Sequence, residues 1–201
     1  MQVIDHIQRG LQDYRQQDYP GVLPEAAILM PFTDAPDPEL ILTVRSQYMP
    51  THAGEVAFPG GRRHLEDADL LATALRESNE EVGLAPDEVR VLGQLSAIPS
   101  RFGMKVTPFV GVVRPDVELV AEPGEIASIF RVPWQFFMEE KPQFTPGEVS
   151  VYGRVLRMPN YYFEGHRIWG LTAFMILDLL NHVFDAGIEY IDHDVYQRNK
   201  S

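Results

Sequence analysis

Three carboxylates gather in the stretch RESNEEVG, residues 76–83, namely Glu77, Glu80 and Glu81. An α-helix advances about 100° per residue, so these side chains fall within one sector beside an apolar stripe. Like charges at such spacings repel by about 0.2–0.5 kcal/mol per pair, and the C-terminal end of a helix disfavours anions. Two interpretations stay open: a solvated acidic face, or ligands for a hard divalent cation such as Mg²⁺.

The helix that carries these acids is expected over about residues 67–82, where apolar side chains recur with helical spacing. Gly83 suits the left-handed position that ends a helix. Arg76 lies one turn before Glu80 and can pair with it. The sector next to the acids, expected to face the core and leave the acids outside it, consists of Leu71, Leu75, Ser78 and Val82.

The remaining elements mix strands with helices and lack the regular alternation of a doubly wound sheet, which favours an α+β fold with a mixed sheet. Strand-like segments are expected at residues 26–32, 39–46, 55–61, 89–98, 105–114, 126–134, 150–158 and 161–163. We expect one domain over 1–201, with an accessory N-terminal helix within about 1–20 and a core of about 26–185. Its last helix is expected at 169–183.

The charge and composition of the chain exclude several functions. Its net charge of −12 argues against nonspecific binding to nucleic acid or an anionic membrane. The absence of cysteine excludes disulfides, zinc–thiolate sites and cysteine nucleophiles. The N-terminus has no apolar run, and the apolar stretch 168–180 is too short to span a bilayer and is interrupted by Asp178. We expect a cytoplasmic protein; the oligomeric state stays open, with a homodimer as one option.

The run GGRRHLEDADLLATALRESNEEVGL, residues 60–84, resembles the Nudix box. The matching residues are Gly61, Asp67, Arg76, Glu77, Glu80, Glu81, Gly83 and Leu84. Three features depart from the usual pattern: Asp67 or Glu66 replaces a glutamate, the spacing to Arg76 is one residue longer, and Ser78 occupies an apolar position. The resemblance implies a Nudix-type α/β/α sandwich with a mixed β-sheet.

A second segment, LTVRSQYMPTHAGEVAFPGG at 42–61, resembles the segment that marks coenzyme A pyrophosphatases within that family. The matching residues are Leu42, Thr43, Arg45, Ser46, His52, Gly54 and the FPGG corner. The longer, Asp-containing box is also typical of this subfamily, whereas Pro50 stands where a basic residue is usual. Residues 98–113 and 168–177 look similar as well, so the resemblance covers most of 26–180.

The resemblance implies hydrolysis of a pyrophosphate linkage with Mg²⁺ or Mn²⁺. It makes Glu77 and Glu81 the expected metal ligands, with Glu80 as a further ligand or as the base that activates water. Arg76 is expected to orient the glutamates. Glu125 matches a glutamate that binds metal or acts as base in some members, although a lone glutamate at a strand entry is often only solvated.

The expected substrate is a small nucleotide of the coenzyme A type, with 3′,5′-ADP and 4′-phosphopantetheine as products. Arg45 and His52 are candidates for contacts with its phosphates; alternatively, Arg45 pairs with an acid and His52 caps a loop. Gly60 and Gly61 allow a tight backbone turn beside the site. The aromatic residues considered for stacking on adenine are Phe58, Phe102 and Tyr48.

Three rival functions are weighed against this one. The first is another Nudix hydrolase, acting on ADP-ribose, NADH or a nucleoside triphosphate, against which the segment 42–61 argues. The second is a non-catalytic sensor of a nucleotide metabolite, which has no need for the full set Glu77, Glu80 and Glu81. The third is a partner-binding domain with an acidic face, for which only the net charge speaks.

Overall fold

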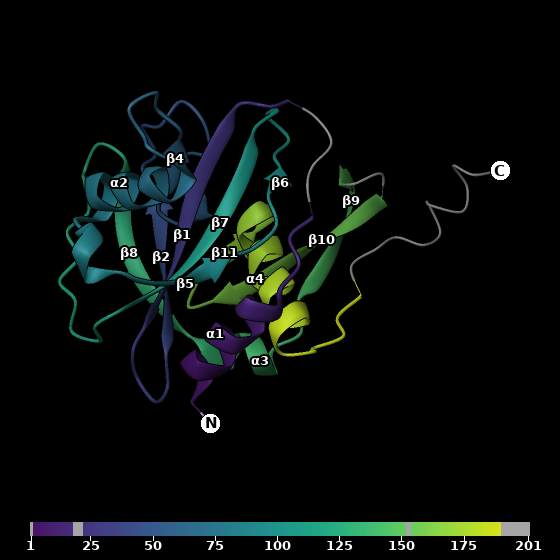
Figure 1. Cartoon of the computed structure of the whole chain (residues 1–201). Helices are drawn as coiled ribbons and strands as arrows, with labels where there is room; N and C mark the ends of the chain where they lie inside the picture. Colours follow the sequence, from purple (N-terminus) through teal and green to yellow (C-terminus); the bar gives the residue numbers. More distant parts are fainter. Residues whose placement is uncertain (1, 18–21, 152–153, 190–201) are drawn as a thin grey trace.

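A mixed β-sheet forms the centre of the computed structural model, which describes residues 2–17, 22–151 and 154–189 (Figure 1). Within those residues the strand order is β3-β2-β1-β7-β5, with β4 paired to β1, β6 to β7 and β8 to β2. Their bounds are β1 Glu25–Thr33, β2 Glu39–Arg45, β3 Val56–Ala57, β4 Gly60–Arg62, β5 Arg90–Gln94, β6 Ile98–Pro99, β7 Lys105–Val113 and β8 Ile126–Pro133. The β1–β7 pair is parallel and the other pairs are antiparallel.

Side chains of β1 alternate between two apolar layers, as the two-residue period of a strand requires. Ala27 and Leu29 pack in the layer under helix α2, Leu70–Val82. Met30 and Phe32 pack in the opposite layer, with helices α1, Val3–Asp13, and α4, Gly170–Val183. Figure 1 shows α2 on one side of the sheet and α1 with α4 on the other. The expected α/β/α sandwich with a mixed sheet is confirmed.

Helix α2 is bounded by two caps. The Asp69 carboxylate accepts a hydrogen bond from the Ala72 N–H at 2.8 Å, and Gly83 ends the helix in the left-handed conformation with φ of 70°. The predicted start at residue 67 is therefore three residues too early. Asp67 lies in the preceding turn because its carboxylate folds back onto the helix.

A smaller antiparallel sheet follows, formed by β9, Gln143–Val151, β10, Arg154–Phe163, and β11, His166–Trp169. Helix α3, Trp134–Glu139, precedes it, and a short 3₁₀ turn, Pro86–Glu88, follows α2. The N-terminal helix is shorter than the range of 1–20 expected for it. Among the described residues, no helix is long and apolar enough to cross a membrane.

Helix α1 docks on α4 and β5 through its apolar residues, and a buried polar contact follows the helix. The Tyr14 hydroxyl donates to Ser96 Oγ at 2.7 Å and lies 3.2 Å from Asp178 Oδ2. Burial, together with the Asp178 charge, raises the pKa of Tyr14 to about 12. Asp178, which interrupts the apolar run of α4, thus has a partner in Tyr14 and a second one in His182, 3.0 Å away.

Candidate active site

Arg76 and Asp67 form the centre of the site. Arg76 Nε and Nη2 donate to the two Asp67 carboxylate oxygens at 2.9 and 3.0 Å, a two-point ion pair. Asp67 also accepts from the Thr73 hydroxyl at 2.9 Å and the His64 N–H at 2.8 Å. The Arg76 guanidinium and these donors hold the pKa of Asp67 well below its usual range, against the effect of burial. Asp67, and not Glu66, therefore ties the preceding turn to α2.

The same guanidinium contacts two of the three glutamates. Arg76 Nη1 donates to Glu77 Oε1 at 2.9 Å and to Glu80 Oε2 at 2.8 Å. The pairing of Arg76 with Glu80 expected from helical spacing is thus present. Arg76 holds Glu77 and Glu80 on one side of α2 while its other nitrogens hold Asp67.

Glu81 departs from the sequence prediction because its side chain is only 3% exposed. The helical projection placed all three acids outside the core, but strand β4 covers Glu81. Its Oε2 accepts from the Gly60 N–H at 2.9 Å and its Oε1 from Arg45 Nη1 at 3.3 Å. The pKa of Glu81 is raised to about 7, mainly by burial and less by the charges of Glu77 and Glu125, while the Gly60 N–H and Arg45 oppose the increase.

Two glycines let β4 approach the acids. A Cβ atom on Gly61 would collide with the Glu77 carboxylate. Gly60 has φ of 150°, and a Cβ there would collide with the backbone of β1. Burial raises the pKa of Glu77, Arg76 lowers it, and the neighbouring charges of Glu80 and Glu125 add to the increase. The Glu77 carboxylate therefore lies against bare backbone in a crowded acidic environment.

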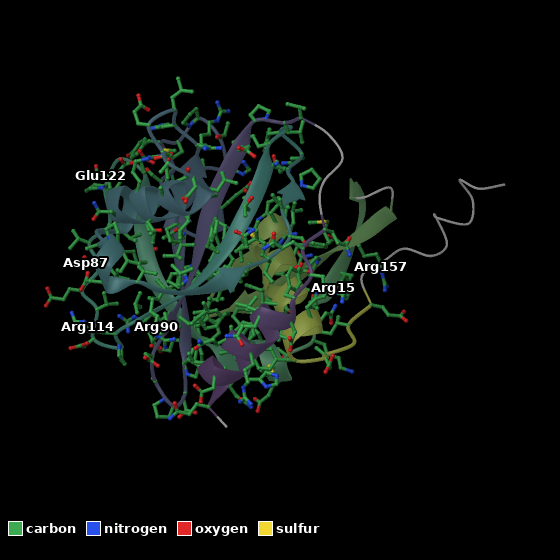
Figure 2. All side chains as sticks on the ribbon, viewed as in Figure 1. Arg15, Asp87, Arg90, Arg114, Glu122 and Arg157 are labelled. Atoms are coloured by element: carbon green, nitrogen blue, oxygen red, sulfur yellow. The ribbon has the colours of Figure 1, made fainter. Side chains whose placement is uncertain are left out.

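Glu125 joins these glutamates from a different element. Two hydrogen bonds fasten the segment before it to the end of α2: Val120 N–H donates to Val82 O and Glu122 N–H donates to Glu81 O, both at 2.9 Å. Figure 2 shows Glu122 beside the α2 layer. The carbonyl oxygen of Glu125 accepts from the Ser46 N–H at 2.7 Å. These bonds place the Glu125 charge near enough to raise the pKa of both Glu77 and Glu81.

Of the residues predicted to contact substrate, Arg45 and the glycine corner lie at the carboxylates. The Arg45 Nε is buried without a hydrogen-bond partner in the described structure. His52 lies in the loop between β2 and β3, where its Nδ1 is 2.6 Å from Glu55 Oε2 and its ring meets Phe102 edge-on. Within the described residues, the hydrogen bonds and ion pairs of His52 do not include Glu77, Glu80 or Glu81.

Phe58 requires a correction. It was a candidate for stacking on adenine, with simple packing as the alternative; it is 3% exposed and belongs to the apolar layer that contains Met30 and Phe32. Its inward direction follows from the short β3 strand that precedes it, whose Val56 packs in the same layer. Phe58 therefore supports the glycine corner from within the core and has no free face for a ligand.

The loop residues that position Glu125 were not foreseen from the sequence. Their bonds use backbone atoms, so side-chain types give no signal for them. Ser78, which departed from the usual box, fits without strain because its hydroxyl donates to the Ala74 carbonyl at 2.7 Å within the helix. Within the described residues, no group of three or more His, Asp or Glu side chains is arranged so that it could hold a metal ion.

Comparison with known proteins agrees with this geometry. The family model described as the NUDIX domain matches residues 23–152. The chain is 42% identical over 158 residues to a protein of Photorhabdus laumondii named uncharacterized Nudix hydrolase NudL, covering 79% of this chain and 84% of that one. It is 37% identical over 155 residues to the protein of the same name from Klebsiella pneumoniae, covering 77% and 80% of the two chains.

Among solved structures, the chain is similar to a MutT/nudix family protein from Enterococcus faecalis, with a TM-score of 0.51 and 13% identity. That alignment covers 92% of this chain and 70% of the other. The family match and the Nudix hydrolase relatives support a pyrophosphohydrolase. The chain belongs to the Nudix family, and its reaction is hydrolysis of a nucleoside diphosphate derivative, for which the family generally uses divalent metal ions.

Proposed function

We propose that this protein hydrolyses the pyrophosphate linkage of coenzyme A or its acyl derivatives, giving 3′,5′-ADP and 4′-phosphopantetheine or its acyl form. The observation that carries the proposal is the position of the segment 42–61, which resembles that of coenzyme A pyrophosphatases. Two of its residues, Arg45 and Gly60, donate hydrogen bonds to Glu81 at 3.3 and 2.9 Å. The segment whose resemblance suggests the substrate class therefore contacts a proposed metal-binding carboxylate directly.

The carboxylates fit a hard divalent cation. Glu77 and Glu81 are the proposed metal ligands, and Glu80 or Glu125 is the proposed third ligand from the protein. All four carry oxygen ligands. Burial raises the pKa of Glu77 and Glu81, and neighbouring carboxylates add to the increase; a bound cation would relieve that repulsion. Since no group of three or more described side chains is arranged to hold an ion, water and substrate phosphate oxygens would complete the coordination of a bound cation.

In the reaction, a water oxygen forms a bond to one phosphorus atom while the bond from that phosphorus to the bridging oxygen breaks. The bridging oxygen leaves with the second phosphate, and the water gives up its protons to a base and to solvent. Bound Mg²⁺ or Mn²⁺ would neutralise phosphate oxygens and lower the pKa of coordinated water. Glu80, whose side chain is 57% exposed, and Glu125, which is exposed and directly precedes β8, are the two proposed bases.

The arginines divide the remaining tasks. Arg76 positions Glu77 and Glu80 through its ion pairs and has Asp67 as a fixed anchor. Arg45 lies beside the carboxylates, with its Nη1 3.3 Å from Glu81 Oε1, and its guanidinium charge would attract a substrate phosphate. His52 lies farther along the same loop, beside Glu55, and would act on a part of the substrate away from the scissile bond.

A panel of substrates tests the proposal. Purified protein with Mg²⁺ or Mn²⁺ is incubated with coenzyme A, acetyl-coenzyme A, ADP-ribose, NADH and nucleoside triphosphates, and products are separated by chromatography. We expect the highest kcat/KM for coenzyme A or its ester, with 3′,5′-ADP as product and loss of activity in Glu81→Gln. A higher kcat/KM for ADP-ribose or NADH would refute coenzyme A as the substrate and would still agree with metal-dependent hydrolysis.

A further inference from the structure

Two arginines share one aromatic side chain on the surface near β3. Arg101 and Phe102 come from the turn between β6 and β7, and Arg167 and Trp169 come from β11; together they are called the arginine–aromatic cluster. The Arg101 guanidinium carbon lies 4.9 Å from the Phe102 ring centre and 5.7 Å from that of Trp169. The Arg167 guanidinium carbon lies 4.8 Å from the Trp169 ring centre. Phe102 is 54% exposed, so part of this aromatic surface faces solvent.

The charges of the cluster are only partly matched. Arg167 donates from Nε and Nη2 to the neutral Asn160 Oδ1 at 2.9 and 2.6 Å, so these two donors bond an uncharged amide. Arg101 has a long contact, 3.5 Å, with Glu55, which His52 also contacts. Two guanidinium groups on one indole repel each other. The hydrogen bonds to Asn160 give Arg167 a structural role. They do not account for the second arginine, Arg101, at the same ring.

The cluster is linked to the carboxylate site through the loop between β2 and β3. Glu55, at the end of that loop, contacts Arg101, and its carbonyl oxygen accepts from the Arg45 N–H at 3.0 Å. Arg45 in turn contacts Glu81. On the other side, the Thr172 hydroxyl, three residues after Trp169, donates to the Val56 carbonyl at 3.0 Å. The loop between β2 and β3 therefore connects the carboxylate site, through Arg45 and Glu81, with the arginine–aromatic cluster, through Glu55 and Arg101.

We propose that the arginine–aromatic cluster is the subsite for the ribose phosphomonoester and purine of a nucleotide whose pyrophosphate lies at the carboxylates. The phosphomonoester is a dianion with three acceptor oxygens, which matches two guanidinium groups lacking full carboxylate partners. The purine stacks on the exposed Phe102 or Trp169 ring. The inference rests on the proposed function for the substrate's identity, and it makes Arg101 and Arg167 the residues that select coenzyme A over nucleotides without a 3′-phosphate.

The test compares coenzyme A with dephospho-coenzyme A, which lacks that phosphate. We expect Arg167→Ala and Arg101→Ala to lower kcat/KM for coenzyme A by about 10- to 100-fold, the effect of losing one or two charge-assisted hydrogen bonds. The decrease for dephospho-coenzyme A should be much smaller. Arg90→Ala is the matched control, since Arg90 is an exposed arginine on β5 that pairs with Asp34 (Figure 2). Equal decreases for both substrates would overturn the inference.

A binding measurement separates this inference from the proposed reaction. Trp134 is 1% exposed, so a fluorescence change on adding nucleotide would come from Trp169. We expect 3′,5′-ADP to bind at least 10-fold more tightly than 5′-ADP, and Arg167→Ala to remove the difference. That result without coenzyme A turnover would refute the proposed function and support the subsite. Normal turnover with equal affinities for the two nucleotides would refute the subsite alone.

Discussion

Glu81 is the residue whose environment departs most from that of a surface glutamate. Its pKa in the folded protein is about 7, mainly because it is buried, whereas an ordinary glutamate has a value of 4.5. A raised pKa means that protonated Glu81 favours the folded state fully below about pH 4.5, and that this contribution is lost as the pH rises through about 7. Without metal, Glu81 therefore disfavours folding at neutral and alkaline pH.

This leads to a prediction for the metal-free protein. Glu81→Gln keeps the side chain neutral, so its unfolding free energy should exceed that of the wild type by a margin that grows between pH 5 and 8, by on the order of 2 kcal/mol. Urea denaturation at both pH values with a chelator present measures the margin. Parallel pH dependences for the two proteins would show that Glu81 is ionised at the same pH folded and unfolded.

Gly61 gives a second prediction at the same scale. In Gly61→Ala the new Cβ displaces the Glu77 carboxylate, and we expect kcat/KM to fall by about 100-fold because a shift of about 1 Å misplaces a metal ligand. The control is Gly93→Ala on β5, whose Cβ would meet Leu11 of α1 at 3.1 Å, away from the carboxylates. Similar activity in both variants would contradict a metal-binding role for Glu77.

At the scale of elements, the turn before α2 matters as much as the helix. Asp67→Asn should loosen Arg76, and with it Glu77 and Glu80, lowering kcat/KM by at least about 10-fold and the unfolding free energy by about 1–3 kcal/mol. Steady-state kinetics and urea denaturation provide the two values. Asp69→Asn in the same turn is the control, because asparagine also caps helices and should change little.

The sequence predicted α2 and its C-terminal cap well, because helical periodicity and Gly83 are local signals. The predicted start of α2, at residue 67, was wrong. Asp67 lies in the turn before the helix, where its carboxylate bonds Thr73 and Arg76 of the helix. The burial of Glu81 was missed for a related reason. A helical projection gives the direction of a side chain but not which strand will cover it, and here β4 covers it.

At the scale of the whole molecule, α1 and α4 lie on the face of the sheet opposite α2, so changes there should affect stability and leave activity intact. Tyr14→Phe removes the hydroxyl bonded to Ser96 and Asp178, and we expect it to lower the unfolding free energy by about 1–2 kcal/mol with kcat/KM unchanged. Denaturation and kinetics on the same samples check this. Tyr162→Phe, at a 55% exposed tyrosine, is the control; equal stability of both variants would contradict an anchoring role for Tyr14.

The order of the strands could not be derived from local patterns. The parallel partner of β1 is β7, whose first residue Lys105 pairs with Glu25 across a long stretch of intervening chain. The arginine–aromatic cluster also depends on segments that are distant in sequence, because Arg101 and Trp169 meet only when β6, β7 and β11 are in place. Fold class and the acidic motif were predictable, whereas contacts between distant segments required the structure.

The most direct test of the central claim, that the buried and exposed glutamates of α2 form a metal site, is a titration with Mn²⁺ followed by electron paramagnetic resonance of the free ion. We predict Mn²⁺ binding to the wild type, which Mg²⁺ competes for, and binding weakened by at least about 10-fold in Glu81→Gln. The control Asp69→Asn should bind as the wild type does. Equal Mn²⁺ affinity in wild type and Glu81→Gln would contradict the assignment of these glutamates as metal ligands.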